Sequence, residues 1–189
     1  TLLEVNLIER FRDPEHDPAK TGVLAAPIFV DGRSPVVLAG REDRGGALHV
    51  VSYELASGSP RTRELGKTSE QAPLSFAGAD GLEVVAVEQQ NAVTLLSLPD
   101  LKPAGTIELT GTLVSMTMTP TPEGVLFLAY LSGRIEARAA MTGELKWARS
   151  LPLGPRPPSA VRLVSPEAIA VIAPSGALLL LGLRDGEYL

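Results

Sequence analysis

The chain has 189 residues, 44% of them hydrophobic and only 4% aromatic, so a core must be built mainly from Val, Leu, Ile and Ala. A formal net charge of −5 argues against nucleic acid held by a general basic field. The absence of cysteine excludes disulfides and thiolate metal sites, and no apolar run is long enough to suggest a membrane span.

The first part of the chain, residues 1–22, stands outside the pattern that fills the rest. Apolar and polar residues alternate from Leu3 to Leu7, which is the period of a β-strand, so a strand is predicted over 2–11. A helix is the second interpretation of this segment. A charged linker with two prolines follows over 12–20.

The rest of the chain divides into four units of short strands, over about 23–66, 72–109, 114–151 and 160–189. The predicted strands are 23–30, 35–39, 48–55 and 61–65; then 73–77, 82–87, 92–98 and 106–109; then 114–119, 124–130, 134–139 and 145–151; and finally 160–164, 168–172 and 177–183. The second strand of each unit is almost wholly apolar, as expected for strands covered on both faces.

The turns of these units recur at a constant spacing. One set falls at positions 58, 101, 143 and 186, with steps of 43, 42 and 43 residues, and a second set at 81, 124 and 167 keeps the same step. Strand-rich repeats of about 40–50 residues are typical of propeller blades. We therefore predict an all-β, β-propeller-like fold with about four blades of four antiparallel strands, complete or part of a larger ring.

The third unit carries the clearest motif. Thr142-Gly143 is followed by Trp147, and this segment resembles the quinoprotein-like, or PQQ, repeat, in which a Thr-Gly turn precedes a Trp that packs between blades. The turns at Asp31-Gly32 and Gly186 are similar to other parts of that repeat. The WD-repeat propeller is a weaker resemblance, because no Trp-Asp pair closes a third strand.

The resemblance implies structural roles for Thr142, Gly143 and Trp147. The first unit departs from the repeat, because Thr62 stands where the Trp is expected. With one Trp and no acidic cluster, the chain lacks what quinone binding in this family needs, so no cofactor is predicted. For the location of the protein, the resemblance slightly favours the bacterial cell envelope or periplasm, and a cytoplasmic location is the alternative.

The ends of the chain raise the question of ring closure. The predicted strand over 2–11 has no blade of its own, and the fourth unit stops within its outermost strand. The N-terminal strand is predicted to complete the fourth blade or a blade of another chain. A closed four-bladed ring, an eight-bladed ring from two chains, and an arc of a longer propeller are the alternatives, of which the arc is preferred.

Polar residues give little sign of catalysis or metal binding. The two histidines, His16 and His49, have no ligand spacing, and no Gly-x-Ser-x-Gly segment is present. Acidic residues alternate with prolines over 13–18, but the segment lacks the glycine and closing glutamate of a calcium loop. We predict no catalytic residue and no metal site.

The remaining candidates lie in the connections between second and third strands. The connection over 41–46 is longer than its counterparts, and insertions in repeat proteins often collect on the binding face. The predicted partner-binding residues are Arg41, Asp43, Arg44, Gln89, Gln90 and Asn91.

The predicted function is therefore a non-catalytic platform or scaffold for protein partners, with self-association through unpaired blades or strand exchange as a further option. The alternatives are a propeller domain of a larger enzyme and a domain that senses a small ligand or glycan.

Overall fold

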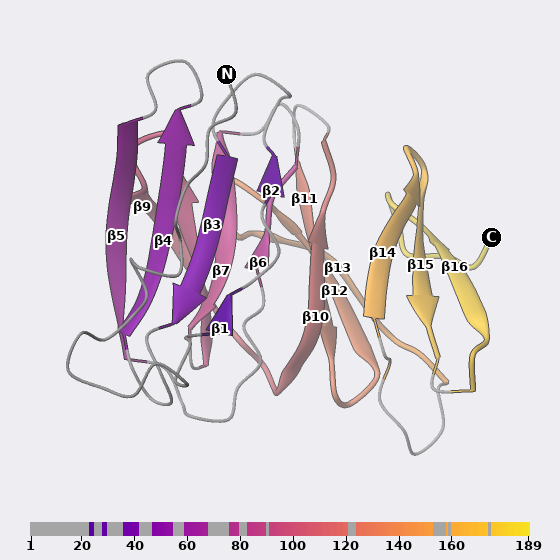
Figure 1. Ribbon diagram of the computed structural model, residues 1–189. Helices are drawn as coiled ribbons and strands as arrows, with labels where there is room; N and C mark the ends of the chain where they lie inside the picture. Colours follow the sequence, from indigo (N-terminus) through magenta and orange to yellow (C-terminus); the bar gives the residue numbers. More distant parts are fainter. Residues whose placement is uncertain are drawn as a thin grey trace.

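The computed structural model describes residues 23–24, 28–29, 36–41, 47–54, 59–67, 76–79, 83–89, 91–120, 124–152, 158, 160–173 and 175–189. All regular structure in these ranges is β-strand, arranged in four small antiparallel sheets (Figure 1). The predicted all-β, propeller-like fold is confirmed. Within the same ranges, no helix has the length and hydropathy that crossing a bilayer requires.

Each sheet is formed by consecutive strands. Sheet 1 contains β1 (Val23–Leu24), β2 (Ile28–Phe29), β3 (Val36–Arg41), β4 (Ala47–Glu54) and β5 (Ser59–Lys67). Sheet 2 contains β6 (Phe76–Ala77), β7 (Val84–Gln89), β8 (Ala92–Ser97) and β9 (Lys102–Glu108). Sheet 3 contains β10 (Leu113–Met118), β11 (Val125–Tyr130), β12 (Arg134–Ala139) and β13 (Leu145–Ser150). Sheet 4 contains β14 (Ala160–Ser165), β15 (Ala168–Ile172) and β16 (Leu178–Gly182).

Two outermost strands are longer than predicted. β5 begins at Ser59 and β9 at Lys102, so both include a proline near the start, Pro60 or Pro103. Each strand pairs with only one neighbour, β4 or β8. A proline has no backbone N–H to donate to a neighbouring strand. It is tolerated on an edge strand, because one side of that strand has no neighbour that needs this hydrogen bond. Both prolines are therefore accommodated within these strands, which begin before the predicted starts at 61 and 106.

The innermost strand of sheet 1 was predicted as one strand over 23–30 but forms two short ones. Both β1 and β2 pair with β3, with Leu24 opposite Gly40 and Ile28 opposite Val37. The innermost segment thus has one more residue between these pairs than β3 has.

The second strands β7 and β11 are buried on both faces, because alternate residues pack against the preceding and the following sheet. In β11, Leu126 and Leu128 belong to the core shared with sheet 2, whereas Val125 and Phe127 belong to the core shared with sheet 4. The same alternation in β7 separates the core shared with sheet 1 from that shared with sheet 3. The described residues thus form three apolar cores, one between each pair of successive sheets.

The sheets follow one another in chain order. Inter-sheet contacts join the innermost strand β10 to β6 on one side and to β14 on the other. Figure 1 shows sheet 1 and sheet 4 at opposite ends of the row. In the described part of the chain, sheet 4 has three strands, and Tyr188 near the C-terminal end forms an isolated bridge with Leu181.

The described turns after the third strands of sheets 2, 3 and 4 sit close to the preceding sheet. A Cβ atom on Gly143 would lie 2.7 Å from Cγ1 of Ile107 in β9, and one on Gly186 would lie 2.8 Å from the ring of Trp147 in β13. The equivalent residue in sheet 2 is Leu101, which has a φ of 56° and is buried in the core between sheets 1 and 2. A left-handed φ is costly for a branched side chain, and burial of the leucine offsets that cost.

Candidate functional site

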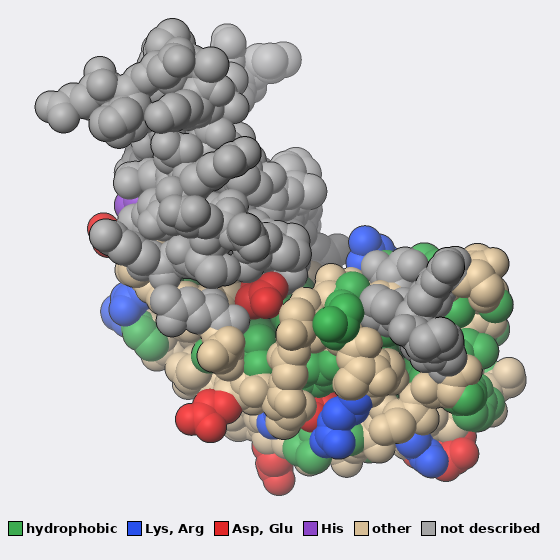
Figure 2. Space-filling model, turned by 90° about the horizontal axis from the view of Figure 1, so that it is seen from below, with side chains coloured by type: hydrophobic (Ala, Val, Ile, Leu, Met, Phe, Trp, Pro, Cys, Tyr) green, Lys and Arg blue, Asp and Glu red, His purple; other side chains and the backbone are tan. Residues whose placement is uncertain are grey.

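The predicted partner-binding rim is only partly described. β3 and β15 both end at the lower end of the sheets in Figure 1, as the repeat requires. Figure 2 looks onto this end, where acidic and basic side chains are interspersed over the described part. Asp43, Arg44 and Gln90 lie outside the described residues, and Arg41 is described only as the last residue of β3.

The two remaining rim residues, Gln89 and Asn91, have different surroundings. The Gln89 side-chain amide donates to the carbonyl oxygen of Leu65 in sheet 1, and its oxygen accepts from the Thr94 hydroxyl at 3.4 Å. Asn91 is exposed, and its main-chain carbonyl accepts from the Leu109 N–H at 2.9 Å. Gln89 thus links two sheets, and the partner-binding role of this rim stays a prediction.

The residues assigned structural roles from the family resemblance lie at sheet boundaries. Trp147 packs in the core between sheets 3 and 4, where its indole N–H donates to the Leu183 carbonyl at 2.9 Å and its ring centroid lies 5.8 Å from that of Phe127. The Thr142 hydroxyl accepts from the Glu144 N–H at 3.3 Å within the turn that contains Gly143.

A buried carboxylate in sheet 3 was not predicted. Glu136 in β12 is 0% exposed and is held by two arginines of the same strand. Arg134 Nε donates to Glu136 Oε1 at 2.9 Å, and Arg138 Nε donates to Oε2 at 2.8 Å. The hydroxyls of Thr110 and Tyr130 each donate to the carboxylate at 3.2 Å.

The environment of Glu136 favours the charged form. Burial alone would raise the pKa of its carboxyl, but the hydrogen bonds and positive charges of Arg138 and Arg134 outweigh burial and lower the pKa below its usual value near 4.5. Burial also raises the pKa of the neighbouring Tyr130 hydroxyl. A general acid needs a raised carboxyl pKa, so the lowered pKa does not suit Glu136 to that role.

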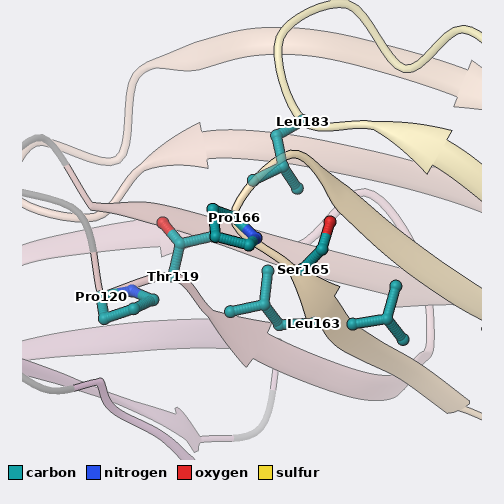
Figure 3. A pocket seen from close by; sticks show the side chains of 7 residues that line it. Thr119, Pro120, Leu163, Ser165, Pro166 and Leu183 are labelled. Carbon is teal, nitrogen blue, oxygen red and sulfur yellow. The ribbon is translucent and has the colours of Figure 1, made fainter.

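A pocket opens between sheets 3 and 4, at the opposite end of the sheets from the predicted rim. Its volume is about 260 Å³. It is lined by Thr119 and Pro120 after β10, by Leu163, Val164, Ser165 and Pro166 at the end of β14, and by Leu183 after β16 (Figure 3). The wall is therefore almost wholly apolar.

The two hydroxyl groups of this wall already take part in main-chain turns. The Thr119 hydroxyl oxygen accepts from the Val125 N–H at 2.9 Å, and the Ser165 oxygen accepts from the Glu167 N–H at 3.2 Å. Among the described residues, no side-chain amide or carboxylate lines the pocket. The site offers shape and apolar contact rather than a set of polar groups.

A second, larger cavity of about 530 Å³ adjoins the first. The two share Pro166 and Leu183 as a common wall. The second cavity is lined in addition by the charged residues Glu167, Arg184 and Asp185 and by Gly182 and Leu189. An apolar compartment thus lies beside a charged one.

The sequence contains a signal for this site that the spacing of turns alone does not reveal. Thr119-Pro120 and Ser165-Pro166 both occur at the end of an innermost strand, β10 or β14, although they are not one repeat step apart. Each hydroxyl caps its turn, and each proline faces the same space.

Among the described residues, no group of three His, Cys, Asp or Glu side chains is arranged to hold a metal ion.

Comparison with solved structures decides the fold family. The chain is similar to BamB from Moraxella catarrhalis, with 11% identity over 89% of this chain and 51% of that one and a TM-score of 0.55. It is also similar to AztD from Citrobacter koseri, with 15% identity over 88% and 45% and a TM-score of 0.62. Both are β-propeller proteins. The chain has the β-propeller fold.

Two computationally designed proteins are also similar. Ika8 matches with a TM-score of 0.61 and 11% identity over 88% of this chain and 48% of its own, and Ika4 with 0.58 and 12% over 85% and 91%. The chain thus spans about half the length of three of these structures. No family model and no curated protein matches the sequence. At these identities the likeness shows the fold alone.

Proposed function

We propose that this β-propeller module is non-catalytic and binds a protein partner. The partner would present an extended segment and insert an aliphatic or proline side chain into the pocket between sheets 3 and 4. The observation that carries the proposal is the apolar lining of that pocket, where Pro120, Leu163 and Leu183 meet.

The surroundings of the pocket favour a peptide. Val164 at its wall is 54% exposed, so an incoming side chain would cover apolar surface that is now in contact with water. The adjoining cavity adds Glu167, Arg184 and Asp185 next to the apolar part. An apolar centre beside polar residues is the usual composition of a protein–protein interface.

A glycan or polar small molecule fits this pocket less well. Recognition of sugar hydroxyls relies on several well-placed polar groups. Here the oxygens of Thr119 and Ser165 already accept main-chain hydrogen bonds. A bound sugar would lose hydrogen bonds to water, and the described wall offers only these two hydroxyls, each with one acceptor position already used, to replace them.

Selection from a phage-displayed library of random peptides tests the proposal. We expect the wild-type chain to enrich peptides with a shared leucine, isoleucine or proline. A Val164→Asp variant places a charge at the pocket wall and should weaken their binding at least tenfold, or about 1.4 kcal/mol.

The matched control is Leu131→Asp. Leu131 is 52% exposed, close to the 54% of Val164, but lies in the turn between β11 and β12 at the other end of the sheet. The Leu131→Asp variant should leave peptide binding unchanged. A selection without a shared apolar residue, or one whose peptides bind the Val164→Asp variant equally well, would contradict the proposal.

A further inference from the structure

In β15 and β16, the side of sheet 4 that faces away from sheet 3 is apolar and is not covered by any described strand, and Arg162 of β14, opposite Ala170, lies on the same side. In β15 and β16, Ile169, Val171, Leu179 and Leu181 pack against sheet 3. The alternate residues therefore point the other way. They are Ala168, Ala170 and Ile172 in β15 and Leu178 and Leu180 in β16, and we call them the outer face of sheet 4.

Two leucines dominate this outer face. Leu178 is 62% exposed and Leu180 is 41% exposed. They lie directly opposite Ile172 and Ala170 in the ladder, so the apolar side chains form one continuous surface. The face carries no charged side chain from β15 or β16.

The corresponding positions of sheet 3 are buried under the next sheet. The pairs Ala129–Ile135 and Phe127–Ala137 of sheet 3 correspond to the pairs Ile172–Leu178 and Ala170–Leu180 of sheet 4, because equal numbers of residues separate the partners. All four residues of sheet 3 are fully buried in the core shared with sheet 4. The outer face of sheet 4 thus has the composition of a sheet-to-sheet interface.

The surface that fits such a face is another sheet of the same repeat. All three apolar cores of the described residues are formed between two such sheets. A second copy of the chain supplies sheets of this kind. Because the chain spans 48%, 51% and 45% of three larger structures with the same fold, two copies supply about the material of one of them.

We propose that two copies of this chain associate, with the outer face of sheet 4 of one copy packed on a sheet of the other. Leu178 and Leu180 would be buried in this contact, as Ile135 and Ala137 are within one chain. The contact lies on a different surface from the peptide pocket.

Sedimentation velocity of the full chain over a range of micromolar concentrations tests the proposal. The wild-type chain should form a concentration-dependent dimer. In the double variant Leu178→Asp/Leu180→Asp, two charges would have to be buried in the contact, so the dissociation constant should rise at least 100-fold. The milder variant Leu178→Ser/Leu180→Ser should raise it at least fivefold and guards against a folding defect.

The matched control is Leu131→Asp/Met141→Asp. It alters two apolar side chains in turns, of which Leu131 is 52% exposed and Met141 is 44% exposed. It should dimerise as the wild type does, and circular dichroism checks that every variant keeps its β-structure. A concentration of about 200 μM is far above the dissociation constants typical of specific complexes. A wild-type chain that stays monomeric at this concentration would overturn the proposal. A dimer that the paired leucine variants leave intact would overturn it too.

Discussion

At the scale of single residues, the turns that follow the third strands control how closely the sheets approach. Gly143 has a φ of 75° and no room for a Cβ, because Cγ1 of Ile107 would lie 2.7 Å away. Gly176 has a similar φ of 84°, but a Cβ there would meet no atom within 4 Å. The pair separates the effect of backbone conformation from that of inter-sheet packing.

We expect Gly176→Ala to lower the free energy of unfolding by about 1 kcal/mol through conformation alone. Gly143→Ala should lower it by about 1–3 kcal/mol more, because the methyl group overpacks the contact with Ile107. Urea unfolding followed by Trp147 fluorescence measures both, since Trp147 is the single tryptophan of the chain. Equal losses in the two variants would show that the turn does not limit the approach of the sheets.

At the scale of one strand, β12 is stabilised by the ion cluster around Glu136. The folded-state pKa of Glu136 lies below the unfolded value near 4.5, so its stabilisation is complete above that pH. The stabilisation is lost as the pH falls through the lower, folded-state value. Removing the charge leaves Arg134 and Arg138 without their buried partner.

We therefore expect Glu136→Gln to lower the free energy of unfolding at neutral pH by about 3–5 kcal/mol. The difference from the wild type should narrow as the pH falls well below about 4.5, where the wild-type carboxylate also becomes protonated. Denaturant titrations at several pH values measure this. Glu108→Gln on β9, where the carboxylate is exposed, is the control and should change little. A loss in the free energy of unfolding of Glu136→Gln that does not change with pH would refute the stabilising role of the Glu136 charge.

At the scale of the whole molecule, stability depends on contacts between successive sheets. β11 in sheet 3 is covered on both faces, whereas β16 in sheet 4 has two exposed leucines on one face. Repeat proteins of this kind are stabilised by their intrinsic units and nearest-neighbour interfaces. Sheet 4, with one described neighbour, should therefore open at a lower free energy than sheet 3.

Hydrogen–deuterium exchange of the monomeric Leu178→Asp/Leu180→Asp variant tests this order. Amides of 168–172 and 178–182 should exchange before those of 125–130 and 134–139. Exchange at one common rate in both sheets would indicate a single cooperative unit. Wild-type chain at dimerising concentrations should protect 178–182 more than the monomeric variant does, which links this measurement to the proposed association.

Much of the fold was predictable because its determinants are local. The apolar run of β11 and the even spacing of the turns identify stacked sheets without any knowledge of their neighbours. The predicted starts of two outermost strands, at 61 and 106, were too late, because β5 begins at Ser59 and β9 at Lys102. A proline is tolerated near the start of such a strand only where its missing N–H is not needed, and this depends on which strands lie at a sheet edge.

The candidate site was much less predictable. Arg134, Glu136 and Arg138 alternate along one strand, so the sequence contains the ion cluster, yet such charges are usually exposed. The peptide pocket needs two turns from different units to meet. By itself, the sequence determined the β-strands, their period and the apolar faces, because each is set by residues close together in the chain. Only the tertiary structure decided which faces are covered, which charges are buried and where a pocket opens, because these depend on residues that meet only when the sheets pack.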